Sequence, residues 1–162
     1  MCSLARLVTT LPGGPLGPEW CYWLPRRFNK AADYLAGKAR KRRRDGVWIS
    51  ERARHAAQRD LIAFTDAGVS EDGLETGQGW IVVDRKQEVL AMGWRYKRHG
   101  AGGAVEVNGE ELEAAARAAD VMVCLRGGRG SDLLSVQGWA ITKGERQQAV
   151  KLLREHSGSD FG

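Results

Sequence analysis

Three apolar, strand-forming runs follow one another between residues 61 and 96, and glycine-rich or polar turns separate them. They are LIAFT at 61–65, GWIVV at 79–83 and a third run at 88–96, which the turn DRKQ joins to the second. Strands that follow one another through tight turns pair antiparallel, so the runs predict a three-stranded meander. At 162 residues, the chain is long enough to cover this sheet with helices around one core.

A helical pattern precedes the meander. Between residues 28 and 39, apolar side chains recur at the spacing of one helix face. The pattern continues into the basic run KARKRRR at 38–44, and Asp45 and Gly46 are expected to stop the helix. Cations in the last turns of a helix also suit the helix dipole.

A second helical pattern follows the meander. The alanine-rich segment 108–126 predicts a helix with Asn108 as its N-cap. Alternatively, this helix ends near residue 119 and residues 121–125 form a strand. Further elements are expected as strands at 19–24 and 133–141 and as a helix at 147–156. The predicted fold class is α/β, a mixed sheet of three antiparallel strands with parallel additions and flanking helices.

Positive charge is concentrated in the first part of the chain. Residues 1–59 contain 13 Lys and Arg against 4 Asp and Glu, whereas residues 60–162 contain 12 against 16. A basic surface attracts phosphate groups, and an acidic part can hold cations. The charge distribution therefore indicates nucleic acid as a partner, and a solvated basic tail is the alternative interpretation.

Several other classes of protein find no support in the sequence. The three Cys and three His residues form no CxxC, triad or metal-ligand spacing. No apolar run approaches the roughly 20 residues that span a bilayer, and residues 1–12 do not resemble a signal peptide. We therefore expect an intracellular protein of the cytoplasm or nucleus with no membrane partner. The sequence does not predict its oligomeric state.

Three carboxylates occur at positions that are typical of a metal site. Asp66 ends an apolar run, Glu111 lies in the first turns of the following helix, and Asp33 follows Asn29 by four residues on the earlier helix. Mg²⁺ is a hard cation that binds carboxylates converging from separate elements. Taken singly, each residue also has an ordinary interpretation as a turn, helix-dipole or surface residue.

The order of these features resembles the ribonuclease H fold. A strand with Asp, two further antiparallel strands and a helix with an early Glu resemble its opening half. The segment YWLPRRFNKAADYLA at 22–36 resembles its closing part, in which a strand leads through a basic loop into a helix with Asn and a metal-binding Asp. The sequences FTDAG and LPRRFNKAADYLA are also similar to segments of the ribonuclease H-like domains of reverse-transcribing elements.

This resemblance implies a metal-dependent endonuclease that hydrolyses the RNA strand of RNA–DNA hybrids with Mg²⁺ or Mn²⁺. The resemblance implies a catalytic, metal-binding set of four carboxylates: Asp33, Asp66, Glu111 and Asp120. It implies that nucleic acid is bound by basic and amide side chains of the first helix and the loop before it: Arg26, Arg27, Asn29, Lys38, Arg40, Lys41, Arg42, Arg43 and Arg44.

The chain departs from the family in three respects. The helix with Asn and Asp precedes the first strand, which a circular permutation or a fragment across a tandem-domain junction would explain. Asp120 is favoured as the fourth carboxylate, although only nine residues separate it from Glu111; if 133–141 is the family's strand instead, Gln137 lies near the site. Trp23 lies nearest to the place where many members have His.

The permuted order assigns residues 1–45 to the strand and the Asn/Asp helix. Residues 46–59 are then a linker, residues 60–156 form the part from the first strand through the Glu helix, and residues 157–162 are a tail. A catalytically inactive ribonuclease H-like module that binds nucleic acid is the alternative function. The decayed reading frame of a mobile element is a third.

Overall fold

All described strands belong to one sheet. The computed structural model describes residues 3–9, 21–53, 60–100, 105–127 and 139–157. The strands run in the order β2-β1-β4-β5-β6-β3-β7. Neighbouring strands pair antiparallel except β3 and β7, which are parallel. The strands are β1 (Ser3–Thr9), β2 (Cys21–Leu24), β3 (Gly46–Ile49), β4 (Leu61–Val69), β5 (Glu75–Asp84), β6 (Val89–Arg98) and β7 (Trp139–Ala140).

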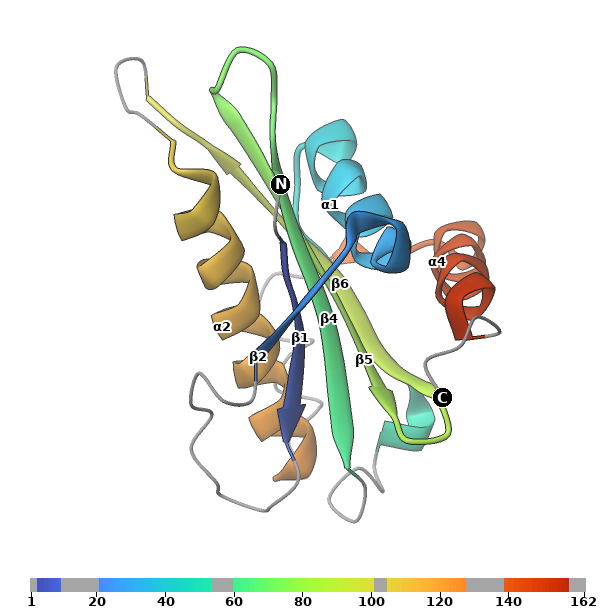
Figure 1. Cartoon of the computed structure of the whole chain (residues 1–162). Coiled ribbons are helices and arrows are strands. Elements are labelled where there is room, and N and C mark those ends of the chain that lie inside the picture. Colours follow the sequence, from blue (N-terminus) through green and yellow to red (C-terminus); the bar gives the residue numbers. More distant parts are fainter. Residues whose placement is uncertain (1–2, 10–20, 54–59, 101–104, 128–138, 158–162) are drawn as a thin grey trace.

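Helices cover both faces of the sheet, so the α/β class is confirmed. They are the short 3-10 helix η2 (Arg26–Phe28) and the α-helices α1 (Lys30–Arg42), α2 (Val107–Arg126) and α4 (Lys143–Ser157). Helix α2 lies against one face, whereas α1 and α4 lie side by side on the other (Figure 1). Among the described residues, no helix has the length and apolar character needed to cross a lipid bilayer.

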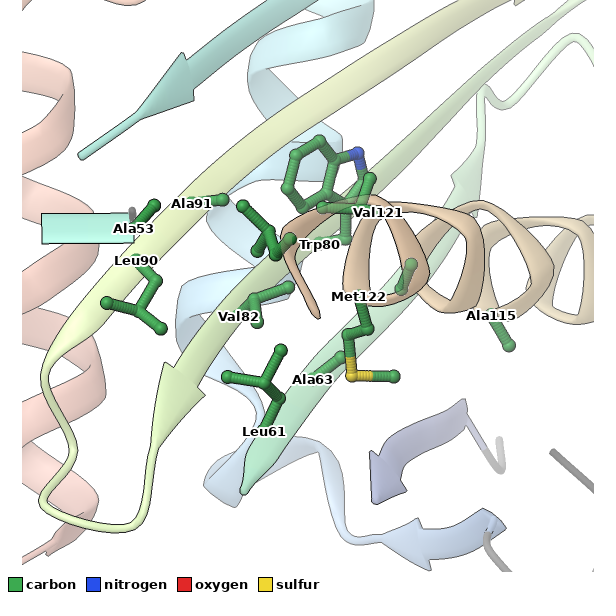
Figure 2. Close-up of a cluster of buried hydrophobic side chains, with 12 residues drawn as sticks. Ala53, Leu61, Ala63, Trp80, Val82, Leu90, Ala91, Ala115, Val121 and Met122 are labelled. Carbon is green, nitrogen blue, oxygen red and sulfur yellow. The ribbon is translucent and has the colours of Figure 1, made fainter. Parts of the chain in front are cut away.

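The apolar core has two parts, one on each side of the sheet. On the α2 side, Met122 and Leu125 pack against Leu61, Trp80 and Leu90, and Figure 2 shows α2 lying over these strands. On the other side, buried side chains of α1, α4 and β5 form the second part. Each fully buried side chain of the size of leucine or methionine stabilises the fold by about 1.5–3 kcal/mol. Alternation along the strands sends successive side chains to opposite faces of the sheet and so fills both parts.

The meander is confirmed, but its first strand is longer than predicted. β4 continues through Asp66 to Val69, and its pairing with β5 extends to Val69 opposite Thr76. The prediction that the strand ends at Asp66 is therefore wrong. The glycines of the acidic segment at 66–78 are compatible with strand pairing, so the chain reverses direction only in a short turn after Ser70. In this turn the Ser70 hydroxyl donates a hydrogen bond to Asp72, and the two side chains accept hydrogen bonds from nearby backbone N–H groups.

Two glycines of β5 bring α1 unusually close to the sheet. A Cβ atom at Gly77 would overlap the carbonyl oxygen of Ala36, and one at Gly79 would overlap the carbonyl oxygen of Ala32. Only glycine permits the helix backbone to approach this closely. Since Gly79 pairs with Asp66 across β4 and β5, one of these two close approaches of α1 occurs beside Asp66.

Segments 1–45 and 60–156 contribute to the same sheet. The strand predicted at 19–24 shares a sheet with the run at 61–65, because β2 and β4 both pair with β1. Residues 19–20 lie outside the described ranges. No sequence pattern predicted β1. The interpretation of 46–59 as a linker is wrong in part, since β3 pairs there with β6 and Ala53 is buried.

The later helices also differ from the expectations. Helix α2 has Glu106 rather than Asn108 as its N-cap, and it continues through residues 121–125, so the strand alternative is wrong. Of the strand predicted at 133–141, the two-residue strand β7 is described, while residues 133–138 lie outside the described ranges. The last helix begins earlier than predicted, after Thr142.

Candidate active site

Asp66 and Asp33 meet between β4 and α1. Asp66 is on the face of β4 that α1 covers, and its side chain is 7% exposed. Asp33, from the first turn of α1, shares a hydrogen bond with it. The side chain of Asp33 remains 39% exposed and forms an ion pair of 3.3 Å with Arg26. Two of the predicted carboxylates, 33 residues apart in the chain, therefore share one site that solvent reaches from the Asp33 side.

The environment of Asp66 opposes ionisation of its carboxyl group. Burial raises the pKa of Asp66 to about 7, and the hydrogen bond and negative charge of Asp33 act in the same direction. The negative charge of Glu111 also raises the pKa, while a hydrogen bond from the backbone N–H of Ala67 lowers it. Carboxyl groups in contact disfavour double ionisation, so the Asp66 carboxyl group keeps its proton up to about neutral pH.

Asn29 joins the start of α1 to β4 next to Asp66. It is 2% exposed, and its Nδ2 donates a hydrogen bond of 2.7 Å to the carbonyl oxygen of Thr65. Although Asn29 is the N-cap residue of α1, its side chain makes no capping hydrogen bond. Its buried Oδ1 has no hydrogen-bond partner among the described residues. Asn29 therefore anchors the start of α1, which carries Asp33, and its Oδ1 is a buried acceptor on the side chain that contacts β4 next to Asp66.

Strand β1 leaves β4 just before this point. The two strands pair from Thr9 opposite Leu61 to Arg6 opposite Phe64, so the pairing ends two residues before Asp66. Along the same edge, the next carbonyl, that of Thr65, accepts the hydrogen bond from Asn29 instead. The separation of β1 from β4 and the anchoring of α1 thus coincide at Asp66.

Glu111 approaches from α2. It is 6% exposed, and its charge acts on Asp66. A neighbouring cluster holds this end of α2 on the sheet: Lys97 of β6 donates to Glu113 at 2.6 Å and to Glu110 at 3.1 Å. Gln78 of β5 donates to Glu110 at 2.7 Å. Because Glu110 and Glu113 are engaged with β5 and β6, the acidic residue of this turn that acts on Asp66 is Glu111.

This supporting cluster was not identified in the sequence. It includes His99, whose ring nitrogen lies 2.6 Å from the Thr76 hydroxyl and 3.7 Å from a Glu110 oxygen, so His99 is not an incidental surface residue. The available signal was the polar pair Thr76 and Gln78 at alternate, inward-facing positions of an otherwise apolar strand. Polar residues at such positions need buried partners.

Asp120 does not join the other carboxylates. It is exposed on α2, nine residues after Glu111. At 1.5 Å and 100° per residue, it lies about 13 Å further along the helix and on its opposite side. The prediction that Asp120 completes the carboxylate set is therefore corrected, because the segment that follows Glu111 is one continuous helix.

Arg27 and the basic residues at 38–44, which were predicted to bind nucleic acid, differ in their surroundings. Three are engaged with acidic residues: Lys38 and Arg42 lie 3.7 and 3.2 Å from Glu145 of α4, and Arg43 lies 3.2 Å from Glu75. Arg40 packs its guanidinium against Gly68 of β4. Arg27 lies over the ring of Phe28, and Lys41 and Arg44 are exposed. The run is therefore partly a structural connection between α1, α4 and β5.

The donor atoms at Asp66 suit a hard cation by their chemistry. Two carboxyl groups in contact, a nearby glutamate and the Asn29 amide oxygen, which has no hydrogen-bond partner in the described part of the chain, are ligands that Mg²⁺ prefers. In the observed conformation, however, no group of three or more Asp, Glu, His and Cys side chains in the described ranges is positioned to hold a metal ion. Closing a site around a cation therefore requires a side-chain movement, for example by Glu111.

Comparisons with protein-family models, curated proteins and solved structures found no match to this chain.

Proposed function

We propose that this chain is a metal-dependent endonuclease of the ribonuclease H type, which hydrolyses the RNA strand of RNA–DNA hybrids with Mg²⁺ or Mn²⁺. The observation that supports this most strongly is the contact between Asp33 and Asp66, with Glu111 within electrostatic range. A pair of carboxyl groups with one buried member is costly for the fold, and groups perturbed in this way cluster at functional sites.

The proposed fold is a permuted ribonuclease H-like domain. In this interpretation β4, β5, β6 and α2 correspond to the opening half, and β2, η2 and α1 correspond to the closing half. The joining of both halves in one sheet supports a permuted domain over a tandem-junction fragment. The location of Asp33 beside Asp66, which the permuted order requires, supports it independently.

The side chains have distinct roles in this proposal. Asp66 and Asp33 hold the cation and orient the attacking water, and Glu111 shares the cation and contacts the ribose 2′-hydroxyl, which distinguishes RNA from DNA. When bound, Mg²⁺ or Mn²⁺ lowers the pKa of water and neutralises the charge of the scissile phosphate. Asn29 and Gly79 position the carboxylates, because they determine where α1 lies against β4. Arg26 and Arg27, both exposed, are proposed to contact phosphate groups next to Asp33.

One observation favours the alternative of a catalytically inactive binding module. With Asp120 on the far side of α2, three carboxylates are available at the site rather than four. A module of this kind would bind hybrid through its basic face without cleaving it.

Cleavage of a labelled RNA–DNA hybrid tests the proposal. With Mg²⁺ or Mn²⁺, we expect the RNA strand to be cut to products with 3′-hydroxyl and 5′-phosphate ends, while EDTA stops the reaction. Double-stranded DNA and single-stranded RNA should remain largely intact because they lack the hybrid geometry. Salt-dependent binding of hybrid with no cleavage under any metal condition would replace the enzyme with the binding module.

A further inference from the structure

A basic groove lies between α4 and β3, outside the carboxylate site. It has a volume of about 760 Å³, and Trp48 of β3 lines it together with four cations of α4: Lys143, Arg146, Lys151 and Arg154. Helix α4 packs beside α1, so the groove is on the side of the sheet that α1 covers (Figure 1). It is distinct from the basic run of α1.

The four cations form one stripe along α4. At 100° per residue, their spacing of three, five and three residues places them within an arc of about 140° around the helix axis, and the stripe extends about 16 Å along the axis at 1.5 Å per residue. Among the described residues, Glu155 is the single acidic residue that lines the groove. Glu145 points to the opposite side of α4, where it is buried and pairs with Lys38 and Arg42. More cationic than acidic side chains of the described chain therefore line the groove.

Trp48 gives the groove a fixed wall. The guanidinium of Arg146 lies 5.1 Å from the centre of the Trp48 ring, and Trp48 packs against the apolar core. A cation over an indole ring is held by the electrostatics of the ring. Arg146 is thus ordered before any ligand binds, which lowers the entropy that binding must lose.

The start of α4 is also fixed. Thr142 and Glu145 form a reciprocal capping box: the Thr142 backbone N–H donates to the Glu145 carboxylate at 3.1 Å, and the Glu145 backbone N–H donates to the Thr142 hydroxyl at 3.2 Å. The same glutamate joins α4 to α1 through its ion pairs. The cationic stripe is therefore held in a fixed position relative to α1 and the carboxylate pair.

We propose that this α4 groove binds the phosphate backbone of a nucleic acid strand, as a second anchoring surface beside the carboxylate site. The choice of nucleic acid as the polyanion rests on the proposed function. A second depression adjoins the groove through Arg154 and is also lined by Lys86, so the surface extends beyond α4, as a long polyanion requires. Its other cations, Arg52 and Arg85, are engaged in ion pairs with Glu88 and Asp60. A membrane surface fits less well, because the exposed large hydrophobic residues of the described chain, Leu112 and Val123, belong to α2 on the other side of the sheet.

The test is equilibrium binding of a fluorescent RNA–DNA hybrid and a DNA duplex to the full chain in EDTA, across a salt series. We expect the double variant Lys143→Gln/Lys151→Gln to bind both duplexes about tenfold more weakly at low salt, and to reduce the slope of log affinity against log salt by about 2. Lys143→Arg/Lys151→Arg should bind like the wild type, since the charges remain. The matched control is Arg98→Gln/Arg117→Gln, which removes the same net charge from β6 and α2 and should leave the affinity nearly unchanged.

Three results would overturn the proposal: an unchanged affinity and salt slope in the Lys→Gln variant, an equal loss in the control, or binding of phosphatidylserine vesicles without binding of either duplex. A parallel cleavage assay in Mg²⁺ separates this proposal from the proposed enzyme. Wild type that binds hybrid through Lys143 and Lys151 but never cleaves it refutes the enzyme alone. Wild type that cleaves hybrid while binding is independent of these lysines refutes the groove alone.

Discussion

The contact between Asp33 and Asp66 is unfavourable for the metal-free fold. Asp66 is buried, and ionisation of both carboxyl groups would place two negative charges in contact. Asn29 and the close approach at Gly79 nevertheless hold α1 where this contact occurs. Residues that are costly for stability yet firmly positioned are typical of functional sites.

The pKa of Asp66 predicts how the stability of the metal-free protein depends on pH. Because folding raises this pKa from 3.8 to about 7, the folded state binds the proton more tightly than the unfolded state. The contribution of this proton to stability is complete below about pH 4 and is lost as the pH rises to about 7. In EDTA at pH 8, we therefore expect Asp66→Asn to be more stable than the wild type by about 1–3 kcal/mol.

Urea unfolding of wild type and Asp66→Asn between pH 4 and pH 8 measures this difference. The gap in the free energy of unfolding should widen with pH, whereas Asp120→Asn should follow the wild-type profile because Asp120 is exposed. A constant gap across this range would show that Asp66 does not titrate as its burial implies.

At the scale of elements, the site depends on how closely α1 approaches β5. The approach needs glycine on the strand and alanine on the helix: Gly77 lies opposite Ala36, and Gly79 lies opposite Ala32. Interiors are packed densely, so an added methyl group here has no space unless the helix moves. A helix that moves outward takes Asp33 away from Asp66.

Alanine substitutions at two glycines test this dependence. Gly79→Ala would place its Cβ atom in overlap with the Ala32 carbonyl oxygen and should lower the free energy of unfolding by about 1–3 kcal/mol. Gly37→Ala, on α1 with no atom within 4 Å of its Cβ, should raise it by up to about 1 kcal/mol, because alanine favours a helix. The measurement is urea unfolding by circular dichroism, and equal stability of the two variants would contradict the packing described for α1.

The elements differ in how far the sequence could predict them. Helix α1, the meander and the positions of Asp33, Asp66 and Glu111 follow from local periodicity and from order along the chain, both of which can be read directly. The location of Asp120 could not be predicted, because the alanine-rich segment permits either a long helix or a helix followed by a strand. Strand β1 has no local signal; it is a strand because it pairs with β2 and β4, which are distant in the sequence.

At the scale of the whole molecule, residues 1–45 and 60–156 form one structure. β1 and β2 extend the sheet beyond β4, and α1 covers the face of β5 on which Gly77 and Gly79 lie. Strands without partners and an uncovered apolar face are unstable in water. The two segments therefore depend on each other for folding.

A fragment of residues 60–162 tests this dependence. We expect it to lack a cooperative thermal transition and to bind a hydrophobic dye, since removal of β1, β2 and α1 exposes both β4 and the second part of the core. The full chain should unfold in one transition. A fragment that unfolds cooperatively by itself would contradict the single-sheet account and would favour separate units on either side of residues 46–59.

The central claim is that Asp33, Asp66 and Glu111 form one metal-dependent active site, and that Asp120 is not part of it. The most direct measurement compares the initial rate of hybrid cleavage in Mg²⁺ for Asp33→Asn, Asp66→Asn, Glu111→Gln and Asp120→Asn. Since loss of residues that only support metal ligands costs about 10–100-fold, each of the first three variants should lose at least about 100-fold. Asp120→Asn should keep its rate within about twofold, as expected for an exposed residue remote from the site. A large loss in Asp120→Asn, or wild-type rates in Asp66→Asn, would contradict the account.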